Sequence, residues 1–276
     1  MPVAQYKATL VVSIYKDVAK LRCILDTLAW QSCRDFEILI SEDGAADTVA
    51  EFLQPYLARL PNLMHLTQED RGFRKNRALN RAILAAHSDY FIFIDGDCVP
   101  HSRFVGAHIN QAEPMAVCAG RRVELGPLFS QRLIEQPEFL QSLESPWHYL
   151  ALSRALHRDA IKNYEFGFVS PLLHHLTRNR PIHIVGSNFS CSRVALEAVN
   201  GFNEEFESPG IGEDADLEWR LAAAGYRTKN IKFLAPVYHL HHPRSYVVSE
   251  RNHRIMAEAQ ARNLWHCQRG LDQATP

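Results

Sequence analysis

Two carboxylates follow directly on a short apolar run in the segment FIFIDGDCVP, residues 91–100. Four large apolar residues predict a strand that is buried on both faces, and the chain then turns into Asp95, Gly96 and Asp97. Asp and Gly favour turns for local reasons alone, so a plain surface turn is one interpretation. The other is that both carboxylates lie at the carboxyl end of a parallel strand, where open α/β sheets bind ligands.

Three histidines stand within four positions in the segment YHLHHP, namely His239, His241 and His242. A lone histidine is more often a surface residue or a satisfied core residue than a ligand. Three at a strand end, in a chain that also has a D-G-D turn, favour metal binding more strongly. A hard divalent cation prefers carboxylate oxygens, and a borderline ion such as Mn²⁺ also accepts imidazole.

Acidic residues recur where predicted strands and helices begin or end. Glu213 and Asp214 in the segment GEDADLEW are the clearest case. Acids in the first turn of a helix are favoured by the helix dipole and often serve only as caps or as a solvated face. The segment alone therefore does not separate a structural role from a catalytic one.

Strands and helices alternate along the first 95 residues, and this alternation would place the acids at one edge of a sheet. Apolar, β-branched runs predict buried strands at residues 8–14, 36–41, 63–66 and 91–94. Apolar residues spaced three and four apart predict helices over residues 18–28, up to about residue 60, and over residues 74–87. The connections are short, so we expect an α/β fold with a mostly parallel central sheet and helices on both faces.

The pattern changes between residues 126 and 181, where amphipathic helical pieces mix with prolines and exposed-looking aromatics. Strand character returns at residues 182–192 and in the segment IKFLAPVYHLHH, and a last helix is expected over residues 251–268. We therefore expect one domain with a helical insertion.

The composition limits the possible partners and compartments. The 276 residues carry a formal net charge of −1, so no global field attracts nucleic acid. The six cysteines form no C-x-x-C pair, and we expect reduced thiols in a cytoplasmic protein. No run reaches the roughly 18 apolar residues of a membrane span, so any membrane contact would be peripheral, at the inner face.

Five blocks in order resemble a family 2 glycosyltransferase with the GT-A fold, from Thr9 to about Arg244. They are TLVVSIYKDVAKLRCILDTLAWQSCRDFEILISEDG, QEDRGFRKNRALNRAILAAHSDYFIFIDGDCVP, GSNFSCSRVALEAVNGFNEEF, GIGEDADLEWRLAAAGYR and VYHLHHPR. The chain is most similar to the branch with the chondroitin polymerase transferase domains and bacterial polysaccharide and lipopolysaccharide transferases. Its second half is also similar to galactosyl- and polypeptide N-acetylgalactosaminyl-transferases.

The resemblance implies an inverting hexosyltransferase that moves a sugar from a UDP-sugar to a glycan or lipid-linked saccharide acceptor in surface polysaccharide synthesis. Its single GT-A domain would comprise a nucleotide-binding half (1–125), a helical insertion (126–181), an acceptor and catalytic half (182–244) and a C-terminal helix (245–276).

The resemblance also implies a nucleotide pocket, in which Asp43 accepts from uracil or ribose and Lys75 or Arg77 lies near the diphosphate. The family more often has two Asp before the glycine that follows the second strand, and an Asn or Glu where Tyr15 and Lys16 stand. The implied nucleotide-binding residues are Ser13, Tyr15, Asp43, Asp70, Arg71, Lys75, Arg77, Asp95 and Gly96.

For the metal, the resemblance implies Mn²⁺ or Mg²⁺ bound by Asp97 and by the distant His239, with His242 as the alternative to His239 and Asp95 as a further candidate. The leaving diphosphate carries concentrated negative charge, which a divalent cation offsets.

For catalysis, it implies Asp214 as the base that takes the proton of the acceptor hydroxyl, and Glu213 as the residue that orients the acceptor sugar. Four residues would border the donor sugar and acceptor, namely Gly186, Ser187, Asn188 and Gly212.

Two other classes fit less well. A sugar nucleotidyltransferase would need a glycine-rich phosphate loop near the first strand, and the segment VVSIYKDVAK has no glycine. A degenerate protein that binds carbohydrate or nucleotide-sugar without turnover would lose its acids, whereas the D-G-D and E-D pairs are both present.

The insertion is rich in basic residues, which either form an ordinary solvated face or meet an anionic acceptor, such as a lipid diphosphate or an acidic glycan. These residues are Arg154, Arg158, Lys162, Arg178 and Arg180. The sequence does not indicate which sugar is transferred or which acceptor receives it.

Overall fold

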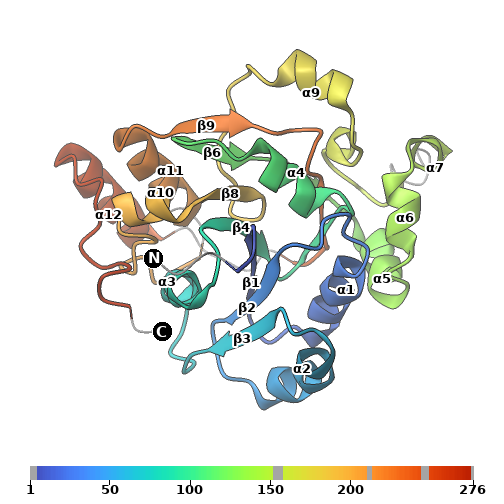
Figure 1. Ribbon diagram of the computed structural model, residues 1–276, viewed down its shortest axis with the longest axis horizontal. Helices are drawn as coiled ribbons and strands as arrows, with labels where there is room; N and C mark the ends of the chain where they lie inside the picture. The colour runs from blue at the N-terminus through green and yellow to red at the C-terminus, as the bar shows by residue number, and fades with distance from the viewer. Residues whose placement is uncertain (1–4, 152–157, 210–212, 244–248, 275–276) are drawn as a thin grey trace.

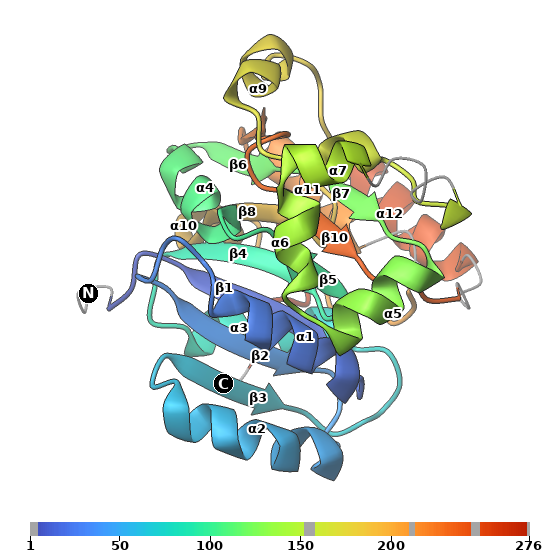
Figure 2. The same ribbon diagram turned by 90° about the vertical axis from the view of Figure 1, so that its right-hand side faces the viewer.

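In the computed structural model, residues 5–151, 158–209, 213–243 and 249–274 are described. A seven-stranded sheet runs through the middle of the molecule, in the order β3-β2-β1-β4-β8-β6-β9 (Figures 1 and 2). Its strands are β1 (Thr9–Ile14), β2 (Glu37–Glu42), β3 (Leu63–Thr67), β4 (Tyr90–Asp95), β6 (Ala116–Ala119), β8 (Phe189–Ser192) and β9 (Arg227–Asn230).

The sheet is mostly parallel, which confirms the predicted α/β class. β1 pairs in parallel with β2 and β4, and β2 pairs in parallel with β3. β8 runs antiparallel to both β4 and β6, and this reversal was not predicted. The strand order changes direction between β1 and β4, which is where open α/β sheets bind ligands.

Each central strand sends alternate side chains to two separate hydrophobic cores, because successive side chains of a strand point to opposite faces. On β4, Ile92 and Ile94 enter one core, and Phe91 and Phe93 enter the other. The first core packs against α1 (Val18–Leu28), α2 (Asp47–Arg59), α4 (Phe104–Gln111), α5 (Pro127–Glu135) and α6 (Phe139–Glu144). The second packs against α3 (Lys75–Ala85), α10 (Arg193–Ala198) and α11 (Glu213–Ala223).

A second, three-stranded sheet was not predicted. It has the order β5-β10-β7, from β5 (Cys98–Pro100), β10 (Val237–His239) and β7 (Arg122–Glu124). β10 is antiparallel to β5 and parallel to β7. Because β5 begins three residues after the end of β4, the chain passes from the large sheet to the small one through the D-G-D turn.

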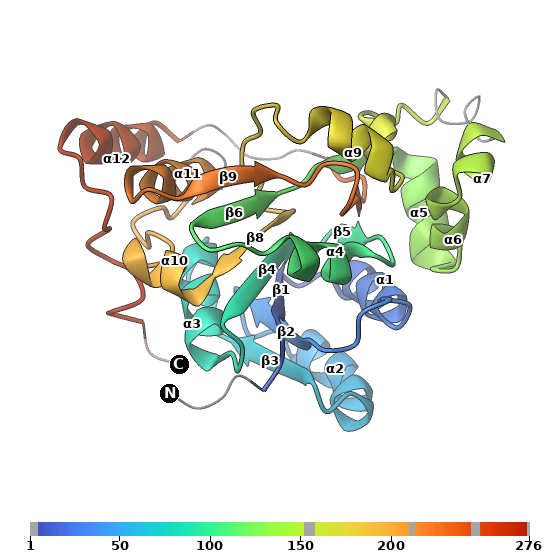
Figure 3. The same ribbon diagram turned by 45° about the horizontal axis from the view of Figure 1, so that its top comes forward.

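The insertion holds α5, α6, α7 (Pro146–Ala151), the short 3₁₀ helix η1 (Tyr164–Phe166) and α9 (Pro171–Thr177). Figures 1 and 2 show α9 projecting from the body of the molecule, and Figure 3 shows α5, α6 and α7 grouped at one side of it. Two of the aromatics that looked exposed in sequence are half-buried, since Phe166 and Phe168 pack against Phe233.

Three sequence expectations for the second half need correction. Residues 182–188 are not strand, and β8 begins only at Phe189. In the segment IKFLAPVYHLHH only Val237–His239 is strand, and residues 232–234 form a turn instead. The last helix, α12 (Glu250–Ala261), ends seven residues before the predicted position. No helix in the described part of the chain is long and apolar enough to cross a membrane.

Candidate active site

A cleft of about 860 Å³ opens where β1, β2 and β4 end. The small sheet and the start of α11 contribute residues to its opposite wall. The acidic residues that line it are Asp17, Asp43, Asp95, Asp97 and Asp214. Its lysines and arginine are Lys20, Lys75 and Arg122, so both signs of charge meet inside one cavity.

Asp97, His239 and His242 meet at one point on the cleft wall. The Oδ2 atom of Asp97 lies 3.4 Å from Nε2 of His239 and 3.1 Å from Nε2 of His242. The two Nε2 atoms are 3.3 Å apart. The sequence had set His239 and His242 as alternatives, whereas the structure brings both to the same carboxylate oxygen.

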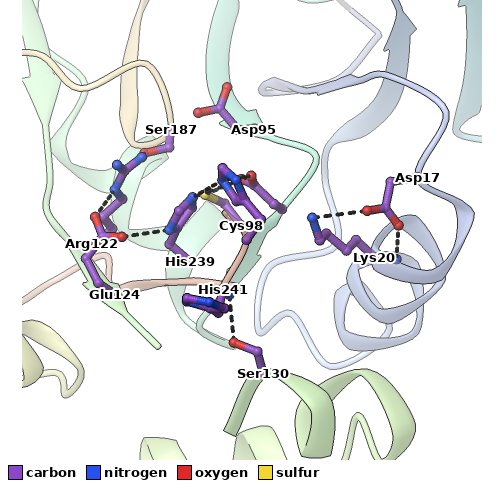
Figure 4. Close-up of polar contacts among 12 residues, drawn as sticks. Asp17, Lys20, Asp95, Cys98, Arg122, Glu124, Ser130, Ser187, His239 and His241 are labelled. Carbon is purple, nitrogen blue, oxygen red and sulfur yellow. Dashed lines mark hydrogen bonds and ion pairs between the residues drawn. The ribbon is translucent and has the colours of Figure 1, made fainter. Parts of the chain in front are cut away.

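The small sheet brings these residues together from distant parts of the chain. Asp97 directly precedes β5, and its backbone carbonyl accepts from the N–H of Leu240 at 2.8 Å. His239 ends β10, and its carbonyl accepts from the N–H of Leu125 at 2.9 Å. The N–H of His241 donates to the Ser130 hydroxyl of α5 at 2.7 Å, as Figure 4 shows. Three hydrogen bonds thus hold the histidine segment against β5, the end of β7 and α5.

The electrostatics of the cluster follow from burial opposed by hydrogen bonding. Burial would raise the pKa of Asp97, but the hydrogen bonds from both histidines outweigh it and hold that pKa well below its usual range. Burial would lower the pKa of His239, but its bonds to Asp97 and Glu124 prevail and raise it to about 9. The bond to Asp97 also raises the pKa of His242. At neutral pH, His239 is therefore an imidazolium between two carboxylates.

The geometry of this cluster fits a divalent cation. Ligands that bind one ion at about 2.1 Å and at right angles are about 3.0 Å apart, and tetrahedral ligands are about 3.4 Å apart. The three ligand atoms are separated by 3.1 to 3.4 Å. A carboxylate with two imidazoles suits a borderline ion such as Mn²⁺. An ion at this point would take the place of the proton on Nε2 of His239.

On the other side of the cleft, Asp43 lies just beyond the end of β2 and is already bonded to the scaffold. Its Oδ1 accepts from the side-chain amide of Gln68 at 2.7 Å, and its Oδ2 accepts from the backbone N–H of Arg74 at 2.6 Å. Each carboxylate oxygen has a second lone pair, so Asp43 can still accept from a ligand.

Tyr15 also lines the cleft, and Lys16 follows it in the chain. The Tyr15 hydroxyl and the Lys16 ammonium both donate to Asp70, at 3.1 and 2.6 Å. The ammonium also lies 4.6 Å from the centre of the Tyr15 ring. Lys16 adopts a positive φ of 59°, which turns the chain sharply out of β1.

The D-G-D turn connects the two sides. Asp95 forms an ion pair with Lys75 of α3, with 2.7 Å between Oδ1 and Nζ. The N–H of Gly96 donates to the carbonyl of Ser13 at 2.7 Å. A Cβ at Gly96 would lie 2.6 Å from Cγ2 of Ile14 and 2.9 Å from that carbonyl, so no larger residue fits without a shift of backbone.

Asp214 lies in the first turn of α11 and lines the cleft. Its carboxylate accepts from two backbone amides, those of Gly186 and Ala215, at 3.2 and 2.8 Å. The other cleft-lining carboxylates all have side-chain partners, whereas none is found for Asp214 among the residues that the structure describes. It is the carboxylate best placed to accept a proton from a ligand.

A buried ion pair holds α11 in place. Asp216 and Arg220 are each 1% exposed and lie 2.7 Å apart. Arg220 also donates to the carbonyls of Val199 and Gly201 at 2.8 Å. Removing one partner of such a pair costs about 3–5 kcal/mol of stability. The pair therefore orients the helix whose first turn carries Asp214.

Several predicted residues do not reach the cleft. Asn188 is fully buried, and its side chain bonds to His108 and to the carbonyls of Arg121 and Ala235, so it cannot border a sugar. Ser187 is also buried. These two placements correct the prediction of a sugar contact.

Arg71 pairs with Glu69 at the surface, and Asp70 is bonded to Tyr15 and Lys16 rather than lining the cavity. Arg77 lines a separate hollow of about 160 Å³ beside Arg269. Gly212 lies outside the described residues, and the structure does not place the side chain of Glu213.

Three residues of the site, Arg122, Glu124 and Lys20, were not predicted from the sequence. Arg122 and Lys20 line the cleft, and Glu124 contacts His239 (Figure 4). The first two were missed because isolated basic residues carry no motif. Glu124 is the last residue of the short strand β7, whose pairing with β10 is visible only in the folded chain.

The fold and this cleft define a glycosyltransferase of the GT-A type. Over residues 9–159, more than half of its length, the chain matches the family model for glycosyl transferase family 2. The chain belongs to this family. Residues 175–243, which carry Asp214 and the histidines, match a second model, the N-terminal domain of galactosyltransferase.

The chain is 28% identical over 228 residues to validoxylamine A glucosyltransferase from Streptomyces hygroscopicus subsp. jinggangensis. The match covers 79% of this chain and 51% of that protein. The chain thus spans about half the length of the curated relatives it matches.

Two solved structures share the fold. One is the mannosyltransferase PcManGT from Pyrobaculum calidifontis in complex with GDP-Man and Mn²⁺, with a TM-score of 0.55 and 16% identity over 89% of this chain and 60% of that one. The other is GalNAc-T7 with UDP, GalNAc and Mn²⁺, with a TM-score of 0.62 and 10% identity over 93% and 48%.

Proposed function

We propose that the protein transfers a hexose from a UDP-sugar to a saccharide or lipid-linked saccharide acceptor, with inversion at the anomeric carbon and with a divalent cation. The observation that carries this proposal is the Asp97–His239–His242 cluster, which opens into the same cleft as Asp43 and Asp214. On this proposal, one cavity combines the candidates for the cation site, for the acid that faces the nucleoside and for the base.

Each group has one task in this mechanism. A bound Mn²⁺ or Mg²⁺ would stabilise the negative charge that the diphosphate gains as the glycosidic bond breaks. Asp97, His239 and His242 would hold that ion. Lys20 and Arg122 supply further positive charge along the cleft, while Asp43 accepts from the uracil or ribose.

Asp214 would accept the proton of the acceptor hydroxyl, which is a poor nucleophile without a base. Its two backbone amide donors keep the carboxylate oriented, and it lines the same cleft as the cation cluster, as an in-line displacement requires. One displacement inverts the anomeric carbon, and no covalent sugar–enzyme intermediate is formed. Gly186 borders the same part of the cleft and is our candidate neighbour of the donor sugar.

We also propose that the insertion, residues 126–181, forms the acceptor side. Leu172 and Leu176 on α9 are 69% and 64% exposed, and the exposed Arg178 and Arg180 follow them directly. Arg158 is exposed too, and Arg154 lies outside the described residues. An apolar edge beside basic side chains suits an anionic lipid-linked acceptor and peripheral contact with an anionic membrane surface, where each basic residue gains about 1 kcal/mol.

The experiment is a transfer assay with a panel of UDP-sugars and candidate saccharide acceptors, in which UDP release and product mass are measured. We expect one UDP-sugar to be consumed, EDTA to stop the reaction, and Mn²⁺ or Mg²⁺ to restore it. Full activity in EDTA would contradict the proposed metal dependence. If no UDP were released from any UDP-sugar, the proposed transferase activity would be contradicted.

The acceptor side is tested separately. The double variant Arg178→Glu, Arg180→Glu should raise the KM for the acceptor and leave the KM for the UDP-sugar unchanged. Binding to vesicles with anionic headgroups should weaken in this variant and at high salt, because salt screens exposed charges. Unchanged acceptor kinetics and unchanged vesicle binding would make the insertion a plain scaffold.

A further inference from the structure

We infer that Glu124 is the residue that orients His239 for the cation, and that Arg122 and Ser187 hold Glu124 for this task. The inference rests on the proposed cation site and adds three residues that contact no cation themselves. Its basis is a continuous chain of polar contacts behind the cluster, which Figure 4 shows from Ser187 to His239.

The contact between Glu124 and His239 determines which ring nitrogen faces the cluster. Oε2 of Glu124 lies 2.7 Å from Nδ1 of His239, on the side of the ring away from Asp97. A carboxylate accepts only, so Nδ1 must carry a proton in this contact. Nε2 is then the nitrogen left for a cation, and it is the atom that faces Asp97.

The strand pairing gives this contact its precision. β7 and β10 are parallel, with Glu124 and His239 at the same level of the small sheet. The backbone of Glu124 is bonded in both directions to Lys162, with each N–H donating to the other carbonyl at 3.0 Å. Glu124 therefore cannot shift along its strand without loss of the bonds to Lys162, and a shift of His239 would break the register with β7.

Glu124 is itself restrained from the far side. Nε of Arg122 donates to its Oε1 at 2.7 Å, and Nη1 of the same guanidinium donates to the Ser187 hydroxyl at 3.2 Å. Each oxygen of the Glu124 carboxylate therefore has its own donor.

His242 has a similar arrangement with a weaker partner. Its Nδ1 lies 3.1 Å from the carbonyl of Pro243, and its Nε2 faces Asp97. Both rings thus turn Nε2 toward the same oxygen, but only His239 is held by a carboxylate. Partners of this kind fix the ring orientation and raise the basicity of a metal-bound imidazole, and their loss typically weakens metal affinity about 10- to 100-fold.

The test is a titration of the full chain with Mn²⁺, alone and with UDP, followed by the electron paramagnetic resonance signal of free Mn²⁺. We expect Glu124→Gln to weaken Mn²⁺ binding about 10-fold and Glu124→Ala by up to about 100-fold. Arg122→Gln should shift binding in the same direction by less. Equal Mn²⁺ affinity in wild type and in Glu124→Ala would overturn the inference.

A matched control is Glu144→Gln. Glu144 is also largely buried and lies 3.6 Å from a histidine, His101, but outside the cleft. This variant should bind Mn²⁺ like the wild type. If it weakens binding as much as Glu124→Gln, the effect of Glu124 is general destabilisation and the inference fails. If wild type binds no Mn²⁺ with or without UDP, the proposed cation site itself fails.

A second measurement does not depend on any Glu124 variant folding. In the proton NMR spectrum of the Zn²⁺-loaded wild type, Nδ1–H of His239 should give a downfield, slowly exchanging signal, because it donates a hydrogen bond to the carboxylate of Glu124. Loss of the signal in His239→Gln identifies it. A Zn²⁺-loaded protein in which His239 carries its proton on Nε2 and binds through Nδ1 would contradict the inference.

Discussion

The seven-stranded sheet and the three-stranded sheet support opposite sides of the cleft by different means. β1, β2 and β4 are each six residues long and almost wholly buried, and β1 pairs in parallel with both of the others. The three strands of the small sheet have three residues each, from positions near 99, 123 and 238. One side of the cleft thus rests on long local elements and the other on short, distant ones.

This difference separates stability from function. The large sheet lies between two cores, so its side chains contribute mainly to the free energy of folding. The small sheet contributes little area, but it determines the relative positions of Asp97, Glu124 and His239. We therefore expect substitutions in the large sheet to change stability and substitutions in the small sheet to change cation affinity.

The largest effect is expected at the cation cluster. Asp97→Ala removes the oxygen that both histidines face, and we expect transfer to fall by about 10³-fold or more, because charge stabilisation by a metal is worth several kcal/mol. Mn²⁺ uptake, measured by calorimetry, should be lost while the protein stays folded. Near-normal transfer in this variant would place the cation elsewhere.

The next effect is expected at the base. Asp214→Asn keeps the shape of the side chain but removes its basicity, so transfer should fall by on the order of 10²-fold or more. UDP and Mn²⁺ binding should be unchanged, because neither involves this carboxylate. If this variant turned over normally while Glu213→Gln did not, the two acids would have exchanged roles.

A smaller effect is expected on the nucleoside side of the cleft. Asp43→Asn replaces an oxygen by an NH₂ group next to the N–H of Arg74 or the amide of Gln68. Loss of a charged hydrogen-bond acceptor costs about 1.5–3 kcal/mol, so UDP affinity should fall about 10- to 100-fold. Mn²⁺ uptake without nucleotide should stay as in the wild type. Loss of both would show that the two sides are not separable.

The smallest effects come from a matched pair, one residue in each sheet. Ile92→Val in β4 should lower the free energy of unfolding by about 1 kcal/mol through a buried methylene and leave Mn²⁺ affinity unchanged. Tyr238→Phe in β10 removes the hydrogen bond that the Tyr238 hydroxyl donates to the carbonyl of Gly167 at 2.5 Å. This change should lower the free energy of unfolding by a similar amount. Only Tyr238→Phe should also weaken Mn²⁺ binding, since Tyr238 directly precedes His239 in β10. Denaturant unfolding and Mn²⁺ titration of both variants decide this.

The first half of the fold was predictable because its signals are local. Every strand and helix up to β4 lies within a few residues of its expected position, since apolar period and turn residues act within one element. The small sheet was not predictable in this way. Three-residue strands have no measurable period, and Val237–His239 acquires its structure only from pairing with Cys98–Pro100 and Arg122–Glu124.

The same reasoning applies to the site. The D-G-D turn and the histidines were visible in the sequence because unusual residue types are close together there. Their convergence, and the choice between His239 and His242, required the folded chain. Asn188 was misplaced because its motif neighbours the cleft while its side chain turns into the core, where Gly120 leaves room for it. Sequence position alone does not give side-chain direction.

The contact between Gly96 and the end of β1 has a consequence for donor length. It is a backbone contact, 2.7 Å from nitrogen to oxygen, with no side chain between the two segments that could adapt. Main-chain atoms therefore set the separation between the Asp43 end and the Asp97 end of the cleft, which are the proposed nucleoside and cation ends. Under the proposed function, a donor must bridge this rigid separation with its phosphates. A nucleoside monophosphate sugar, one phosphate shorter, could then occupy the nucleoside end or reach the cation, but not both.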